Sequence, residues 1–236
     1  METVKGTALV LRTCNANMTS HNRFTWPKSG PVECPDWVAS TYCGNGLHGA
    51  LWGQGYGALF NWSPDAVWQV VQIEEWIDLD GKVKFPRGIV VHTGNQETAT
   101  KYITENGASG SVIGAMTATG HCGTATAGYN GTATAGESGT AIAGDYGTAI
   151  AGDYGTAIAG YNGAATAGDF GTAIAGHCGT ATAGHCGIIQ IKHFDGKRYR
   201  IKVGYVGEDG IQPNVPYSLD HDGNFIKAVD SRPESV

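Results

Sequence analysis

Basic side chains are missing from the middle of this chain. From Gly107 to Ile191 there is no lysine or arginine. The acidic residues of the same segment are Glu137, Asp145, Asp153 and Asp169. A segment without basic groups cannot neutralise phosphates, so we expect no nucleic acid partner. Four carboxylates are too few to imitate a nucleic acid, and the net charge of −6 over 236 residues is mild.

Long apolar runs are missing as well. Met1 is followed by Glu-Thr-Val-Lys, without the apolar core of a secretory signal peptide. No run reaches the length of a membrane-spanning helix. Six cysteines in a chain without that signal predict free thiols rather than a disulfide framework. We expect no membrane partner, no secretion by a signal peptide and a cytoplasmic location.

What the chain has instead is an eight-residue repeat. Eight units of the pattern Gly-Thr-Ala-(Thr/Ile)-Ala-Gly-x-x follow one another from Gly123 to Cys186, and a degenerate ninth begins at Ala115. A fixed period is typical of a stacked architecture. Two glycines in eight residues disfavour a helix by roughly 1 kcal/mol each, and collagen needs glycine at every third position. The repeat therefore predicts a parallel β-solenoid.

Two octads per coil would give sixteen residues per turn and two flat faces. Side chains alternate along a strand, and so narrow a coil has room only for alanine inside. The third and fifth positions then point inward, and the second and fourth point outward. The inverse arrangement, with isoleucine inside and alanine outside, remains an alternative. Eight octads make four coils, about 19 Å long at the usual rung spacing. The candidate binding face comprises Thr140, Ile142, Thr156, Ile158, Thr172 and Ile174.

The ends of a solenoid need covers, because open rungs pair with other strands. We therefore expect three parts in a mainly β protein. Residues 1–106 form an N-terminal α+β cap, residues 107–191 the octapeptide solenoid, and residues 192–236 a small C-terminal β-hairpin cap with a frayed tail.

Local signals predict the elements of the caps. Ser63-Pro64-Asp65 resembles a helix start, and residues 98–105 form a short amphipathic helix. Asp80-Gly81 and Asp195-Gly196 are typical of two-residue hairpin turns. Strands are expected at 7–12, 69–77, 82–85, 89–92, 188–194 and 197–206.

The histidines and cysteines of the N-terminal cap are its candidate chemical groups. Cys34, Cys43 and His48 could form a metal site or a Cys–His nucleophile, but their spacing is not that of a zinc knuckle. The glycine-rich stretch around His48 matches neither the dinucleotide fingerprint nor the P-loop. We therefore expect no catalytic residue and no cofactor, and only a possible pocket at His48 and His92.

Three His-Cys pairs occur at repeat corners, at His121, His177 and His185. Zinc binds both residue types at about 2–2.3 Å. With sixteen residues per coil, His121 and His185 share an edge but lie four rungs apart, about 19 Å. We expect no metal site within one molecule.

Aromatic residues divide between the two architectures. All six tryptophans lie between Trp26 and Trp76 and predict an N-terminal core, with a carbohydrate or peptide platform as the alternative. Tyr129, Tyr146 and Tyr161 fall on one edge of the solenoid and predict a stacked ladder.

Several motifs carry a family resemblance. These are CGNGLHG, SPDAVWQVV before an Asp-Gly hairpin, the octads, and DGKRYRIKVGYVGEDGIQPN. In this layout the chain resembles an uncharacterised phage- and prophage-associated family, a domain of unknown function with a central repeat. The resemblance implies a phage origin and a host-cell or virion location, and it brings no catalytic residue.

Three classes of function follow. The first is a non-enzymatic phage structural protein whose solenoid surface serves assembly, as a homo-oligomer or with another phage or host protein. The second is a module that sequesters a host factor or small ligand, as an anti-defence protein does. The third is an ice-binding solenoid, disfavoured because both faces mix threonine with isoleucine and no secretion signal is present. We expect the first.

Overall fold

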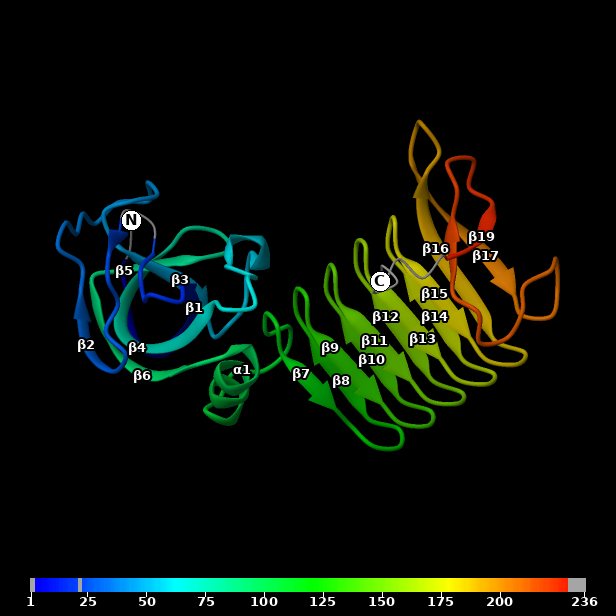
Figure 1. Ribbon diagram of the computed structural model, residues 1–236, viewed down its shortest axis with the longest axis horizontal. Coiled ribbons are helices and arrows are strands. Elements are labelled where there is room, and N and C mark those ends of the chain that lie inside the picture. Colours follow the sequence, from blue (N-terminus) through cyan, green and yellow to red (C-terminus); the bar gives the residue numbers. More distant parts are fainter. Residues whose placement is uncertain (1–2, 21–22, 229–236) are drawn as a thin grey trace, which may run out of the picture. The chain divides into compact units, whose positions relative to one another are not determined.

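The structure is a computed structural model that describes residues 3–20 and 23–228. It divides into two compact units, Met1–Met116 and Thr117–Val236 (Figure 1). The expected solenoid boundary at Ile191 falls inside a strand, and the expected frayed tail, 230–236, lies outside the described residues.

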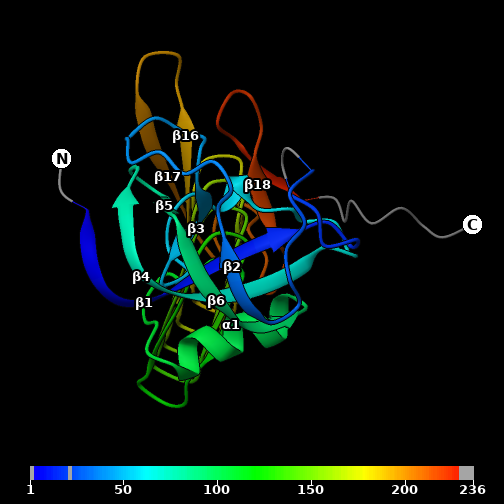
Figure 2. The same ribbon diagram turned by 90° about the vertical axis from the view of Figure 1, so that its left-hand side faces the viewer.

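The first unit is a barrel-like sheet with one helix. The strands are β1 (Val4–Cys14), β2 (Gly30–Glu33), β3 (Leu47–Leu51), β4 (Val67–Asp78), β5 (Val83–Phe85) and β6 (Arg87–Gly94). Their order is β1-β3-β5-β4-β6-β2, and β1 also pairs with β4, which closes a ring (Figure 2). A 3₁₀ turn (Gly57–Leu59) precedes β4, and α1 (Gln96–Glu105) follows β6. None of the described helices has the length and apolar character needed to cross a membrane.

Tryptophan contributes to the core of this unit, as predicted. Trp26 and Trp68 are buried, and Trp37, Trp52 and Trp76 pack against the buried cluster from its margin. Trp62 stacks edge-on against Trp68 at 5.3 Å between ring centroids. The core interpretation is confirmed, and the residues inside the ring include Val10, Val71, Ile73 and Phe85.

Of two local predictions for the first unit, the turn at Asp80-Gly81 is confirmed and the helix at Ser63 is wrong. Asp80 and Gly81 have φ values of 57° and 88°, the positive pair of a type I′ hairpin, so that prediction is confirmed. The predicted helix at Ser63 is wrong. Ala66 donates to the carbonyl of Ser63 at 2.9 Å, which closes a single turn, and β4 begins at the next residue. Strand pairing along twelve residues outweighs the cost of nucleating a short helix.

The second unit is the predicted parallel solenoid. One sheet contains β8 (Thr124–Ala127), β10 (Thr140–Ala143), β12 (Thr156–Ala159) and β14 (Thr172–Ala175). The other contains β7 (Met116–Ala118), β9 (Thr132–Ala135), β11 (Thr148–Ala151), β13 (Ala164–Ala167) and β15 (Thr180–Ala183). Thr140 pairs with Thr156, and Thr156 with Thr172, so one coil is sixteen residues.

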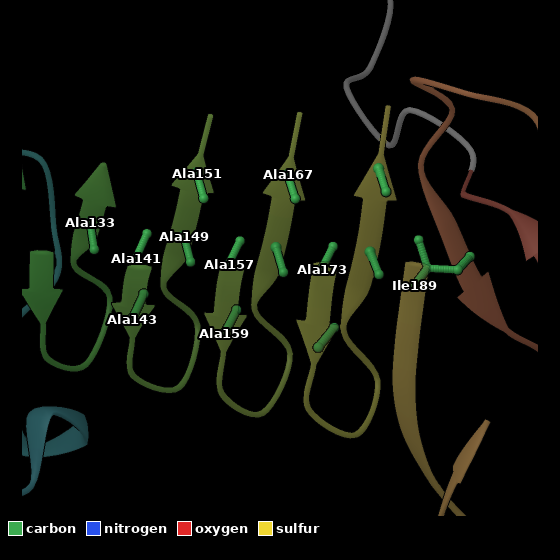
Figure 3. Packing of buried hydrophobic residues seen from close by; sticks show 14 of the residues in the cluster. Ala133, Ala141, Ala143, Ala149, Ala151, Ala157, Ala159, Ala167, Ala173 and Ile189 are labelled. Carbon is green, nitrogen blue, oxygen red and sulfur yellow. The ribbon is translucent and has the colours of Figure 1, made fainter. Parts of the chain in front are cut away.

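Alanine fills the space between the two sheets. Ala141, Ala149 and Ala157 are fully buried, and all the alanines at the third and fifth positions of the eight regular octads are at most 4% exposed. Figure 3 shows their methyl groups pointing between the two rows of strands. The facing with alanine inside is confirmed, and the inverse alternative is wrong.

Glycine is required at the corners by close approach rather than by its own backbone angle. The corner residue with positive φ is the last of the two tip residues, for example Tyr146 at 58° and Cys178 at 60°. A Cβ on Gly144 would lie 2.8 Å from the carbonyl carbon of Gly128 in the coil below. The flanking glycines therefore allow adjacent coils to stack at strand spacing.

The C-terminal end of the solenoid is covered by two hairpins. β16 (Ile188–Phe194) continues the first sheet and pairs with β17 (Tyr199–Tyr205), while β18 (Tyr217–Leu219) and β19 (Phe225–Lys227) continue the second. Ile189 and Ile191 occupy the interior positions that alanine holds elsewhere, and Ile211 and Tyr217 pack onto them. Larger side chains fit here because the last rung borders the cap.

Enlarging one interior alanine should overpack the solenoid. We expect Ala141→Leu to lower the free energy of unfolding by about 1–3 kcal/mol, because the methyl group is fully buried between the sheets. Thr140→Val, on the outer side of the same strand, should change it little. Urea unfolding followed by circular dichroism measures both. Equal stability of the Ala141→Leu variant and the parent would contradict the tight alanine packing.

Candidate functional site

The outer faces of the solenoid form regular arrays of short side chains. On the first sheet, the residues at the second octad position are Thr124, Thr140, Thr156 and Thr172. Those at the fourth position are Thr126, Ile142, Ile158 and Ile174. We call these eight residues the first face. It includes all six residues predicted as a binding face, and none of its side chains is charged.

The spacing of the first face is set by the backbone. Neighbouring rungs lie about 4.8 Å apart, and residues two apart along a strand are separated by roughly 6.6 Å. The threonine column runs through four rungs without interruption. Each threonine presents a hydroxyl and a methyl group, and all eight side chains are β-branched with few χ1 states. The face is therefore a flat, rigid lattice of alternating polar and apolar groups.

The second sheet offers a comparable but interrupted array, which we call the second face. Its columns are Thr132, Thr148, Ala164, Thr180 and Thr134, Ile150, Thr166, Thr182. It contains more threonine than the first face. However, Ala164 interrupts its threonine column with a side chain that has no branch at Cβ. The first face therefore has the more uniform repeat along the rod.

Hydrogen bonds at the corners hold the coils in register. The N–H of Tyr146 donates to the carbonyl of Tyr161 at 2.8 Å, and the N–H of Tyr154 donates to that of Asp169 at 2.8 Å. The Oδ1 atom of Asp145 accepts from the N–H of Tyr161 at 2.8 Å, and that of Asp153 from Asp169 at 2.8 Å. These aspartates link successive coils.

Aromatic rings reinforce one corner edge. Tyr146 lies 5.3 Å from Tyr129 and 5.7 Å from Tyr161, centroid to centroid. The opposite edge carries a parallel stack of Tyr154 on Phe170 at 5.1 Å. The predicted ladders are confirmed, and they limit twisting of the coils that carry the two faces.

The predicted pocket histidines have different surroundings. His92 on β6 stacks on Tyr102 of α1 at 5.1 Å and bonds Thr98 Oγ1 at 3.1 Å. His48 on β3 lies opposite Lys84 on β5. The cavity found in this unit, about 480 Å³, is lined by neither histidine. The pocket at His48 and His92 stays a prediction without support from this geometry.

Sequence reasoning missed a buried lysine beside His48. Lys84 is fully buried, and its Nζ donates to Ser40 Oγ at 3.2 Å and to the carbonyls of Tyr42 and Gly44 at 3.0 and 3.2 Å. Alternation along β5 places Lys84 on the side opposite Val83 and Phe85, which are also buried, so no local sequence signal predicts its burial. Burial and then the charges of Lys82 and Lys84 lower the pKa of His48 to about 4. This cluster ties the loop before β3 to the barrel.

The corner histidines and cysteines remain apart. His121 and Cys122, like His185 and Cys186, lie on the edge that carries Tyr154, while His177 lies on the opposite edge beside Tyr161. Among residues 3–20 and 23–228, no three His, Cys, Asp or Glu side chains gather closely enough to hold a metal ion.

Comparison with known proteins gives two results. Residues 8–103 match the model of a domain of unknown function, DUF7666, which corresponds to the first unit. No solved structure matches this chain. The expected domain of unknown function is thus supported.

The relatives found are ice nucleation proteins. One from Xanthomonas campestris pv. translucens is 45% identical over 102 residues, 42% of this chain and 6% of that protein. One from Pseudomonas fluorescens is 44% identical over 102 residues, 42% of this chain and 8% of that protein. InaU of Pantoea ananas is 38% identical over 99 residues, 40% of this chain and 10% of that protein. The chain spans a tenth or less of the length of these relatives.

These relatives correct the functional expectation. The predicted phage origin and the phage structural role are wrong, because the matching proteins are bacterial and carry the name ice nucleation protein. The class that the sequence analysis disfavoured is the one they support. The mixture of threonine and isoleucine is no argument against ice binding. Isoleucine shares the β-branched shape of threonine, so the columns stay regular.

The half-buried His48 makes the stability of the first unit pH-dependent. Its pKa is about 4 in the folded unit and near 6.5 when exposed, so the unfolded chain binds more protons between these values. This contribution is complete above about pH 6.5 and is lost as the pH falls towards 4. His48→Gln should therefore reduce the fall in Tm between pH 7 and pH 4.5. Tryptophan fluorescence reports on this unit, because all six tryptophans belong to it.

His221→Gln is the matched control, since this side chain is fully exposed in the other unit. Identical pH profiles for the parent and the His48 variant would contradict a lowered pKa of His48 in the folded unit.

Proposed function

We propose that the solenoid binds ice through its first face. The observation that carries this proposal is the uninterrupted column of Thr124, Thr140, Thr156 and Thr172, held in register at strand spacing beside a column of equally branched side chains. The names of the relatives support it independently.

The proposed mechanism depends on order in the side chains. Hydroxyl groups at fixed positions hydrogen-bond water, and the methyl groups between them restrict the orientations that the remaining waters can take. Because the array is already rigid, little side-chain entropy is lost when it contacts a crystalline surface. Repeat distances of about 4.8 Å and 6.6 Å are on the scale of the spacings in the ice lattice.

Absence of charge on the faces fits this mechanism. A charged group orders water around itself and strongly resists desolvation, which would disrupt a lattice shared with ice. The acidic residues of the solenoid lie at its corners, where Asp145, Asp153 and Asp169 bond the next coil. The proposed activity needs no catalytic group and no cofactor.

The patch in this chain is small. Four rungs with two columns span about 14 Å along the rod at strand spacing. A surface of this extent can adsorb to ice that already exists, whereas starting a crystal requires an ordered layer over a larger area. We therefore propose adsorption to ice, with restraint of crystal growth, as the main activity of this segment.

Charges placed in the threonine column should abolish binding. In Thr140→Lys with Thr156→Lys, two flexible ammonium groups would replace ordered hydroxyls at the centre of the first face. We expect the protein to be excluded from a slowly growing ice front and to lose its restraint of recrystallisation. Protein recovered from the ice fraction measures this.

Two control variants make the experiment specific. Ser138→Lys with Cys186→Lys adds the same charge at exposed corners, and it should leave ice binding unchanged. Thr148→Lys with Thr180→Lys tests the second face. If only the second-face variant lost binding, the choice of face would be wrong. If the parent were excluded from ice, the proposed function itself would fail.

A further inference from the structure

The hairpin of β16 and β17 differs in charge from the rest of the chain. It carries five basic side chains and one acidic one, Asp195, a net charge of +4 in a chain whose total is −6. The basic residues are Lys192, Lys197, Arg198, Arg200 and Lys202, and all are exposed. Asp195 pairs with Arg200 and accepts from the N–H groups of Lys197 and Arg198, so it stabilises the turn.

The same hairpin exposes a row of apolar side chains. Tyr199, Ile201, Val203 and Tyr205 are between 40% and 63% exposed, and alternation places them on one side of β17. Phe194 on β16 extends the row, since it pairs with Tyr199. β17 is the last strand of its sheet (Figure 1). An exposed apolar row on an edge strand is typical of a contact surface.

A groove of complementary character lies on the first unit. It has a volume of about 480 Å³ and runs over the outer side of β2, β6 and β4. Pro31 and Ile89 line its apolar part. β2 is likewise the last strand of its sheet.

The polar lining of this groove is acidic. It includes Glu33, Glu74 and Glu75 with one cation, Arg87, which pairs with Glu75 at 3.4 Å. Glu33 and Glu74 are exposed and make no ion pair with any described residue. Two carboxylates beside an exposed apolar strip match a basic, apolar ligand.

We propose that the β16–β17 hairpin of one copy docks in this groove of a second copy. The apolar row would cover Pro31 and Ile89. Lys192, which pairs with Ile201 and so lies on the side of the row, and Arg198 of the turn would pair with Glu33 and Glu74. Both patches lie at sheet edges, so no strand has to be displaced. Because the two patches differ, the contact is head-to-tail and generates open chains unless the rotation closes. It does not use the Thr/Ile columns and goes beyond the proposed ice binding.

Charge reversal tests the pairing with the full chain. Lys192→Glu with Arg198→Glu removes the net positive charge of the hairpin, and Glu33→Lys with Glu74→Lys makes the groove basic. Sedimentation velocity at low salt should show concentration-dependent association of the parent. Each double variant alone should weaken it by about tenfold or more, because the attraction between the two patches is lost in the hairpin variant and reversed in the groove variant.

An equimolar mixture of the two double variants should associate again, since each then offers the charge that the other needs. Lys101→Glu with Glu105→Lys, which exchanges two charges on α1, is the control and should behave as the parent. Circular dichroism should show that the exposed substitutions leave the fold intact.

The proposal is overturned if the parent stays monomeric at every concentration. It is also overturned if the mixture fails to associate, which would mean that the two patches do not meet. Association of the parent that neither reversal weakens would place the contact elsewhere, for example on the tyrosine edge. None of these readouts involves ice, so the outcome is separate from that of the proposed function.

Discussion

The structure of the second unit depends on one register, the parallel pairing of residues sixteen positions apart. Once Thr140 lies beside Thr156, every other feature of the coil is determined. The interior narrows to the width of two methyl groups, the corners approach within contact of one another, and the outward side chains fall into columns. Any residue that breaks the period would disturb all three at once. This explains why the octads vary at their tips and outer positions and keep alanine inside.

The solenoid could be predicted from the sequence because its information is local and repeated. Each octad specifies a strand, a corner and a facing, and the neighbouring copies make the same choice. The first unit is different. Its ring closes because β1 pairs with residues of β4 that lie 53 to 72 positions later, and no short sequence pattern predicts that pairing. The buried Lys84 is also a tertiary feature, since its acceptors come from the loop at residues 40–44.

For the candidate site, too, the local geometry could be predicted from the sequence and the role could not. The residues of the first face were identified correctly as outward-facing, because alternation alone places Thr140 and Ile142 on the side opposite Ala141. The proposed ice-binding role of these residues was disfavoured, because the mixed composition of the columns was given more weight than their geometry. In the amino-acid sequence, a column that mixes threonine and isoleucine looks irregular. On the sheet both side chains branch at Cβ, and the surface keeps one repeat distance.

The two ends of the alanine stack are marked by different substitutions at the same interior positions. At the first rung, Thr117 and Thr119 replace alanine, and Thr117 Oγ1 donates to the carbonyl of Thr126 at 3.1 Å. That bond satisfies an acceptor on the open edge of β8, the end strand of its sheet. At the last rung, Ile189 and Ile191 replace alanine and bury themselves under the cap. At the first rung the threonine hydroxyl occupies an acceptor on the open strand edge, and at the last rung the larger isoleucines pack against the C-terminal cap. The repeat therefore begins and ends by a change of interior side chain, while its backbone register continues through both.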